Sequence, residues 1–204
     1  MISIELVMAI AAYAFVTCAT PGPNNILLTG FGANFGFVKT LPAVFGIVAG
    51  GASINIGVGL GLGALLQEYG FVKELLKVAG SLYLAFLSWK LLNTNPGGAG
   101  VADSDGEPKP FSFFEAFSFQ YVNPKVWLML TTANVSFAVM GPDYWMSVIM
   151  ITLTFMVVGT PSIMLWAGFG QLVSRLLGRP AYRRIFNACM ASMTILCVVY
   201  IWSV

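Results

Sequence analysis

The sequence contains no histidine, only three cysteines and few charged residues, which make up 9% of the chain. Because carboxylates are also almost confined to the ends of apolar segments, zinc sites, Ser/His/Asp triads and histidine proton relays have almost no residues to form them. We therefore expect no enzymatic activity, no metal and no cofactor. Cys18, Cys189 and Cys197 lie in apolar segments without CxxC spacing, which is typical of small buried side chains.

What is present is apolar, since 58% of the 204 residues are hydrophobic, a share outside the range of soluble proteins. The longest uncharged runs are residues 6–38, 40–67, 144–174 and 185–204. Each is long enough for a helix to cross the hydrocarbon core of a membrane, which takes roughly 20 residues. The sequence predicts an all-α integral membrane protein. We expect it to contact the lipid bilayer and to bind no nucleic acid.

We predict six membrane spans, at about residues 4–34, 41–66, 72–92, 113–139, 144–172 and 183–203. Residues 93–112, NTNPGGAGVADSDGEPKPFS, are rich in Gly, Pro, Asp and Ser, and this composition predicts a cytoplasmic linker. The linker divides a single transmembrane domain, residues 1–204, into two halves of three spans each, about 1–92 and 113–204.

Lysine and arginine in the loops set the predicted orientation. The loops after spans 1, 3 and 5 carry Lys39, Lys90, Lys109, Arg175, Arg179, Arg183 and Arg184, whereas the opposite side carries Lys73 and Lys77. This bias places the odd-numbered loops in the cytoplasm and both termini in the periplasm. Because each half has three spans, the halves enter the membrane in opposite orientations, which predicts the inverted repeat of many secondary transporters.

The motif TPGPNN interrupts the first span near its middle. Pro21 and Pro23 have no N–H group and their rings clash with the preceding turn, so the helix should stop and restart there. Gly22 is then the N-cap and Pro23 the first residue of the new helix. The N–H groups of Asn24 and Asn25 are left without helical partners, and such a helix end favours an anion.

A similar break is predicted in span 4, within QYVNPKVW. Asn123 is a good N-cap and Pro124 a good first residue, and Lys125 follows in an otherwise uncharged run. Lys125 lies roughly 15 Å along a helix from Glu115, near mid-bilayer, where a lysine costs about 3 kcal/mol. A static kink and a lysine that reaches the membrane interface are the plain alternatives. Two matched breaks with a buried cation favour a polar cavity between spans 1 and 4.

Span 2 carries a stripe of small residues at steps of three or four: Ala43, Gly46, Gly50, Ser53, Gly57, Gly61 and Ala64. Such a stripe packs helices closely in lipid, and it also permits a homodimer or a sliding surface. Asn55 lies off the stripe and either bonds across helices or lines the cavity. Pro161 breaks span 5, as a hinge or as a static kink.

TPGPNN is followed in order by GANFGF at 32–37, the small-residue span 2, AGSLYLAFLSWKLL at 79–92 and FSFQYVNPKVWLML at 117–130. Together these motifs resemble the LysE/RhtB family of bacterial amino-acid exporters, over nearly the whole chain. The paired asparagines look most like the branch that exports cysteine and O-acetylserine. The resemblance implies secondary active export across the bacterial inner membrane, by alternating access and driven by the proton gradient.

The sequence departs from many relatives, which have an acidic residue in place of Asn24. A neutral Asn24 cannot take up a coupling proton, so Glu5 and Glu115, near span ends, are the remaining carboxylate candidates. The site offers a full positive charge but only dipoles for an ammonium, which favours neutral over basic amino acids. The resemblance implies neutral or small substrates such as cysteine, O-acetylserine, threonine or homoserine.

We expect the amino acid to bind between the two broken spans. Its carboxylate would face the lysine and the N–H groups of the first motif, and its ammonium would face freed carbonyls and amide oxygens. The predicted substrate-binding residues are Gly22, Asn24, Asn25, Asn55, Gln120, Asn123 and Lys125, and the predicted helix breaks or hinges are Pro21, Pro23, Pro124 and Pro161.

Two other classes of function stay open. A membrane thiol relay also has two three-span halves, but it needs a cysteine in spans 1 and 4; Cys18 meets the first demand and span 4 has none. A non-transporting membrane subunit would use the buried Lys125 to pair with a partner helix. Uptake of a labelled amino acid by the purified protein in liposomes separates the transporter from this last class.

Overall fold

The computed structural model describes residues 3–63, 68–93, 101–102, 108–175 and 180–203. Its helices, in chain order, are α1 (Ile4–Ala19), α2 (Pro23–Phe35), α3 (Phe37–Gly57), η1 (Val58–Leu62), α5 (Gly70–Asn93), α6 (Phe113–Val122), α7 (Pro124–Phe137), α8 (Tyr144–Thr154), η2 (Phe155–Gly159), α9 (Thr160–Ser174) and α10 (Pro180–Ser203). Two short strands, β1 (Val101–Ala102) and β2 (Pro108–Lys109), pair antiparallel within the predicted linker. Residues 94–100 and 103–107 of that linker, and Ala64 of the span-2 stripe, lie outside the described residues.

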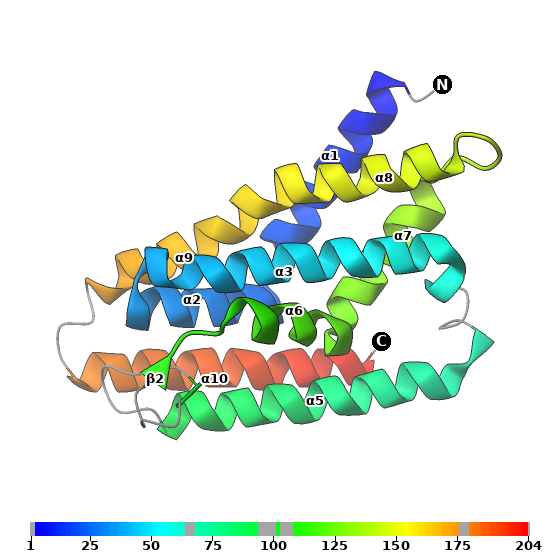
Figure 1. Ribbon diagram of the computed structural model, residues 1–204. Helices are drawn as coiled ribbons and strands as arrows, with labels where there is room; N and C mark the ends of the chain where they lie inside the picture. Colours follow the sequence, from blue (N-terminus) through cyan, green and yellow to red (C-terminus); the bar gives the residue numbers. More distant parts are fainter. Residues whose placement is uncertain (1–2, 64–67, 94–100, 103–107, 176–179, 204) are drawn as a thin grey trace.

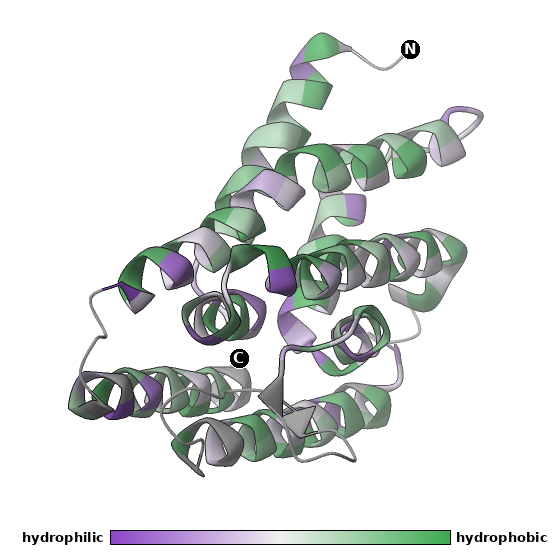
Figure 2. Ribbon diagram, turned by 60° about the vertical axis from the view of Figure 1, so that its left-hand side comes forward, coloured by the Kyte–Doolittle hydropathy of each residue, from purple (hydrophilic) through white to green (hydrophobic). Residues whose placement is uncertain are grey.

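Three stretches of the described chain are apolar and long enough to cross a membrane. Phe37–Leu62 and Tyr144–Ser174 have mean hydropathies of 1.8 and 2.1, and α1 with α2 forms a third candidate, bent by 58°. Much of the length of the long helices is coloured as hydrophobic residues in Figure 2. The all-α membrane class is therefore supported. The ends of these helices lie within four residues of the predicted ends of all six spans. The inverted repeat of six crossings stays a prediction.

The long helices lie side by side, with the short ones between them (Figure 1). The rod formed by α8, η2 and α9 packs on α2, α3 packs on α6, and α5 packs on α10. Helix α1 leaves this arrangement at a steep angle, and its N-terminal end projects from the bundle. The halves of spans 1 and 4 are therefore separate helices, and the two breaks lie inside the bundle.

Glycines bring the short helices into backbone contact with the long ones. A Cβ atom on Gly46 would lie 2.2 Å from the carbonyl oxygen of Phe113, and one on Gly50 would lie 2.7 Å from that of Phe117. These two members of the span-2 stripe thus pack α3 against α6 of the same chain, as expected for small residues between membrane helices. They are not available to a second copy of the chain.

Two helices contain a π-helical turn: η1 continues the C-terminal end of α3, and η2 lies between α8 and α9. In η1, Gly61 has φ of +100°, a conformation that favours glycine. In η2, the turn comes directly before Pro161, whose ring has no N–H group to bond to the preceding turn. Hydroxyl groups bond to carbonyls of that turn, since Thr160 Oγ1 donates to Met156 O and Ser162 Oγ to Val158 O. Whether Pro161 acts as a hinge stays a prediction.

Candidate functional site

At the first break, a side chain donates hydrogen bonds to the free carbonyl groups at the C-terminal end of α1. Helix α1 ends at Ala19, and α2 begins at Pro23 with the extended Gly22 as its N-cap. Asn25 is 3% exposed, and its Nδ2 donates to Cys18 O at 2.9 Å and to Thr20 O at 2.7 Å. The side-chain Nδ2 of Asn25 is therefore used to satisfy carbonyls that the break leaves free.

The second break leaves one polar atom without a partner. Helix α6 ends at Val122, and α7 begins at Pro124 with Asn123 as its N-cap. Asn123 Oδ1 accepts from the backbone N–H of Lys125 at 3.2 Å, which fixes the amide orientation. Asn123 is 2% exposed, and its Nδ2 has no hydrogen-bond partner among the described residues. A buried donor of this kind costs about 1–3 kcal/mol until an acceptor reaches it.

Lys125 joins the two breaks. Its Nζ donates to Thr20 O at 2.8 Å, to Thr20 Oγ1 at 3.0 Å and to Pro21 O at 3.3 Å. The ammonium thus lies at the C-terminal end of α1, which carries partial negative charge. Its aliphatic stem lies over Gly22, where a Cβ atom would be 2.8 Å from Lys125 Cδ. The absent side chain at Gly22 therefore gives Lys125 its path to α1.

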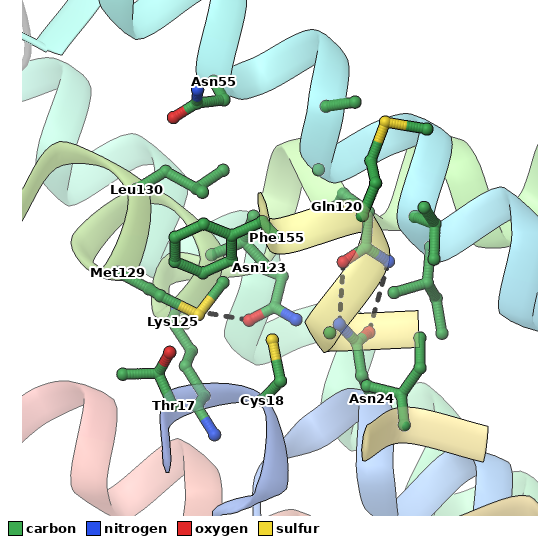
Figure 3. Close-up of a pocket in the computed structure, with 18 of the residues that line it drawn as sticks. Thr17, Cys18, Asn24, Asn55, Gln120, Asn123, Lys125, Met129, Leu130 and Phe155 are labelled. Atoms are coloured by element: carbon green, nitrogen blue, oxygen red, sulfur yellow. Dashed lines mark hydrogen bonds between the residues drawn. The ribbon is translucent and has the colours of Figure 1, made fainter. Parts of the chain in front are cut away.

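A reciprocal amide pair connects the same two breaks. Asn24 Nδ2 donates to Gln120 Oε1 at 2.8 Å, and Gln120 Nε2 donates back to Asn24 Oδ1 at 3.2 Å and to Ala116 O at 2.8 Å (Figure 3). Gln120 is fully buried. The pair ties α2 to α6, so each amide already has a partner.

A cavity of about 80 Å³ lies between the two breaks, the middle of α3 and the junction of α8 with η2. Its polar lining comes from the breaks and from Thr17, Asn55 and Thr152 of α1, α3 and α8, and Figure 3 shows Asn123 among the side chains that line it. Its other side is mostly apolar. The lining residues include Thr17, Cys18, Gly22, Asn24, Asn25, Ile47, Val48, Gly51, Ala52, Asn55, Gln120, Asn123, Lys125, Met129, Thr152, Phe155, Met156 and Gly159.

Asn55 both bonds across helices and lines the cavity. Its Nδ2 donates to Thr152 Oγ1 at 2.8 Å, and its Oδ1 accepts from Asn134 Nδ2 at 2.7 Å. All three side chains are at least nine-tenths buried. This cluster joins α3, α7 and α8 beside the cavity, and within it the buried Oδ1 of Asn134 has no hydrogen-bond partner among the described residues.

The structure brings all seven predicted substrate-binding residues to one cavity. The prolines of the breaks, Pro21, Pro23 and Pro124, and Pro161 are absent from its described lining. Sequence reasoning missed the apolar lining from α3, α7 and η2, such as Gly51, Met129, Phe155 and Met156. Helical periodicity in span 2 marks one of these, because Gly51 falls one turn before Asn55.

The carboxylates proposed as proton carriers lie elsewhere. Glu115 forms the capping box of α6, since its Oε2 accepts from Ser112 N at 2.8 Å while Ser112 Oγ accepts from Glu115 N. Glu5 lies in the exposed first turn of α1. Neither residue lines the cavity.

Comparison with known families and proteins shows the family of the chain. The family described as LysE type translocator matches residues 15–202. The chain belongs to the LysE family. Within this translocator family, the chain is 30% identical over 201 residues to the cysteine/O-acetylserine efflux protein of Escherichia coli O139:H28, and 97% of each chain is covered. It is 29% identical over 200 residues to the protein of the same name from Salmonella typhimurium LT2, with the same coverage.

The resemblance to this family predicted from the motifs is therefore confirmed. No solved structure matches this LysE-family chain.

Proposed function

We propose that the protein exports small neutral amino acids, of the size of cysteine or O-acetylserine, from the cytoplasm across the bacterial inner membrane. The observation that carries this is the unpaired Nδ2 of Asn123, buried in a cavity between the broken helices of a translocator. The relatives named for efflux of cysteine and O-acetylserine support the substrate class. Both termini are proposed to lie in the periplasm, with six spans in two inverted halves.

The carboxylate of the substrate has a defined place in this proposal. It accepts from Asn123 Nδ2 and from the backbone N–H groups at the start of α2, beside Lys125. A helix N-terminus carries partial positive charge, and a charge-assisted hydrogen bond to a buried amide is worth more than a neutral one. The amide of Asn123 is thus a donor to the carboxylate, because its oxygen already caps α7.

In this proposal, two contacts between the breaks change during the transport cycle. The Asn24–Gln120 pair and the Lys125–Thr20 contact join the first half of the chain to the second. A rocking of one half against the other changes these contacts while the substrate stays between them, as in alternating access. The proton gradient drives the cycle in this proposal.

The test is transport by the purified protein in proteoliposomes. We expect uptake of labelled cysteine and O-acetylserine when a pH gradient is imposed, and a fall to the rate of protein-free vesicles when an ionophore removes the gradient. Uptake that is unchanged by the ionophore would remove proton coupling and keep the substrate class. A rate equal to that of empty vesicles under every condition would refute the proposed function and favour the non-transporting subunit.

Asn123→Asp tests which end of the substrate the amide faces. Aspartate keeps the oxygen that caps α7 but replaces the free donor by a second, charged oxygen. Because that oxygen repels a carboxylate, we expect the KM for cysteine to rise at least about ten-fold, the effect of losing roughly 1.4 kcal/mol of binding. Asn123→Ser, which keeps a capping oxygen without the charge, should lie between the wild type and Asn123→Asp.

The opposite sign would contradict this orientation. If the amide instead faces the ammonium of the substrate, Asn123→Asp lowers the KM, because the new charge attracts a cation. Initial rates over a range of cysteine concentrations give this KM directly.

A further inference from the structure

One face of α3 forms a wall of the cavity. Ile47, Val48, Gly51, Ala52 and Asn55 line it, and their spacing of three and four residues places them on one side of the helix. Gly51 lies in the middle of this face. A Cβ atom built on Gly51 would have no atom within 4 Å, so the space in front of this glycine is open.

The adjacent glycine behaves differently. A Cβ atom on Gly50 would lie 2.7 Å from both Phe117 O and Gln120 Cγ, so Gly50 is required for the close approach of α3 and α6. Gly51 has no such packing role. The empty space that it leaves belongs to the cavity, because the residues one turn before and after it also line the cavity.

The cavity has a polar part and an apolar part. Asn24, Gln120, Asn123 and Lys125 come from the breaks. The wall of α3 contributes mainly apolar side chains, and Met129 and Phe155 add further apolar surface. A zwitterion bound at the breaks therefore directs its side chain toward apolar surface.

We propose that Gly51 is a specificity-determining residue that sets the largest amino-acid side chain the cavity accepts. This inference rests on the proposed export of small amino acids. At about 10–15 Å³ of cavity for each water-sized unit, 80 Å³ holds roughly five to eight such units, whereas cysteine has about seven non-hydrogen atoms and O-acetylserine about ten. By this measure cysteine fills the cavity and O-acetylserine slightly exceeds it, so added methyl groups at position 51 compete with the substrate side chain.

The test compares Gly51→Ala and Gly51→Val with matched variants at Gly168, which lies in the middle of α9. A Cβ atom on Gly168 would meet its nearest neighbour, Phe37 Cδ2, at 4.0 Å, and Gly168 is absent from the cavity lining. Each variant is reconstituted in proteoliposomes, and initial uptake rates are measured for labelled alanine, cysteine and O-acetylserine. Size-exclusion chromatography checks that each variant is folded.

We expect Gly51→Val to lower the rate for O-acetylserine relative to alanine at least about ten-fold, since one methylene in a tight pocket is worth roughly 10- to 200-fold in selectivity. Gly51→Ala should shift the ratio in the same direction by less, and it keeps the test valid if the valine variant does not fold. The Gly168 variants should leave the ratio unchanged.

Two results separate the inference from the function on which it rests. If the wild type transports these amino acids and Gly51→Ala and Gly51→Val lower all rates equally, or none, Gly51 does not select by size and the inference fails alone. If the wild type transports none of them, the proposed function fails and this inference fails with it.

Discussion

Lys125→Met is expected to abolish transport while the protein still inserts and folds. Methionine keeps an apolar stem over Gly22 but has no donor for the two oxygens of Thr20 or for Pro21 O. It also removes the positive charge beside the carboxylate position. Hydrogen bonds from a charged group are worth about 1.5–3 kcal/mol each, so the loss of one in the transport cycle predicts a fall of at least about ten-fold, and the loss of several predicts no measurable transport.

Initial uptake of labelled cysteine by equal amounts of reconstituted protein measures this effect. Lys39→Met is the matched control, because Lys39 is exposed at the start of α3 and is absent from the cavity lining. Its rate should equal that of the wild type. Normal transport by a well-folded Lys125→Met variant would refute the role of Lys125.

A second measurement distinguishes two roles of Lys125: binding the substrate and holding α1 in place. Cys18 lines the cavity, whereas Cys189 is exposed on α10. Substrate should slow the alkylation of Cys18 in the wild type and leave Cys189 unchanged. If Lys125 contributes to the substrate site, Lys125→Met removes this protection; if it only holds α1 in place, the protection persists and the melting temperature alone falls.

The helix breaks could be predicted from the sequence because their causes are local. Proline removes a donor and fixes its own φ, and Asn and Gly are preferred N-caps, so PGPNN and NPK mark where helices restart. The resulting ends, at Pro23 and Pro124, lie where these signals place them. The long uncharged runs predicted helical segments for the same reason, since the length of a run depends only on the residues within it.

The partners of the amides could not be predicted in this way. Asn24 pairs with Gln120, 96 positions away, whereas its neighbour Asn25 bonds to the end of α1. Both residues are asparagines in one motif, and only the positions of α6 and of the end of α1 around the start of α2 distinguish them. The free Nδ2 of Asn123 follows from the same packing, because no described side chain reaches it.

For the two adjacent glycines of span 2, the sequence predicts part of what the structure shows. Gly50 belongs to the small-residue stripe and packs on α6, and Gly51 lies about 100° further around the helix, facing the cavity. Periodicity therefore separates their faces from the sequence alone. What faces each of them depends on the arrangement of helices far apart in the chain.

Gly170→Ala is expected to destabilise the protein more than any cavity substitution. A Cβ atom at this position would lie 2.0 Å from Thr29 O and 2.9 Å from Ala33 N, both backbone atoms of α2. Gly32 on α2 faces the same contact from the other side, where a Cβ atom would lie 2.0 Å from Ala167 O. Neither helix can yield by rotating a side chain, so α2 and α9 must separate along a buried interface.

Overpacking of this kind costs about 1–3 kcal/mol or more, and each kcal/mol lowers the melting temperature of a chain of this size by about 2–4 °C. We therefore expect the melting temperature of Gly170→Ala in detergent to fall by about 2–12 °C. Gly168→Ala, two residues away on α9, is the control, because its Cβ atom has 4.0 Å of space and alanine favours a helix by up to about 1 kcal/mol over glycine. Its melting temperature should stay level or rise slightly. Equal melting temperatures for the two variants would show that α2 and α9 are not in backbone contact.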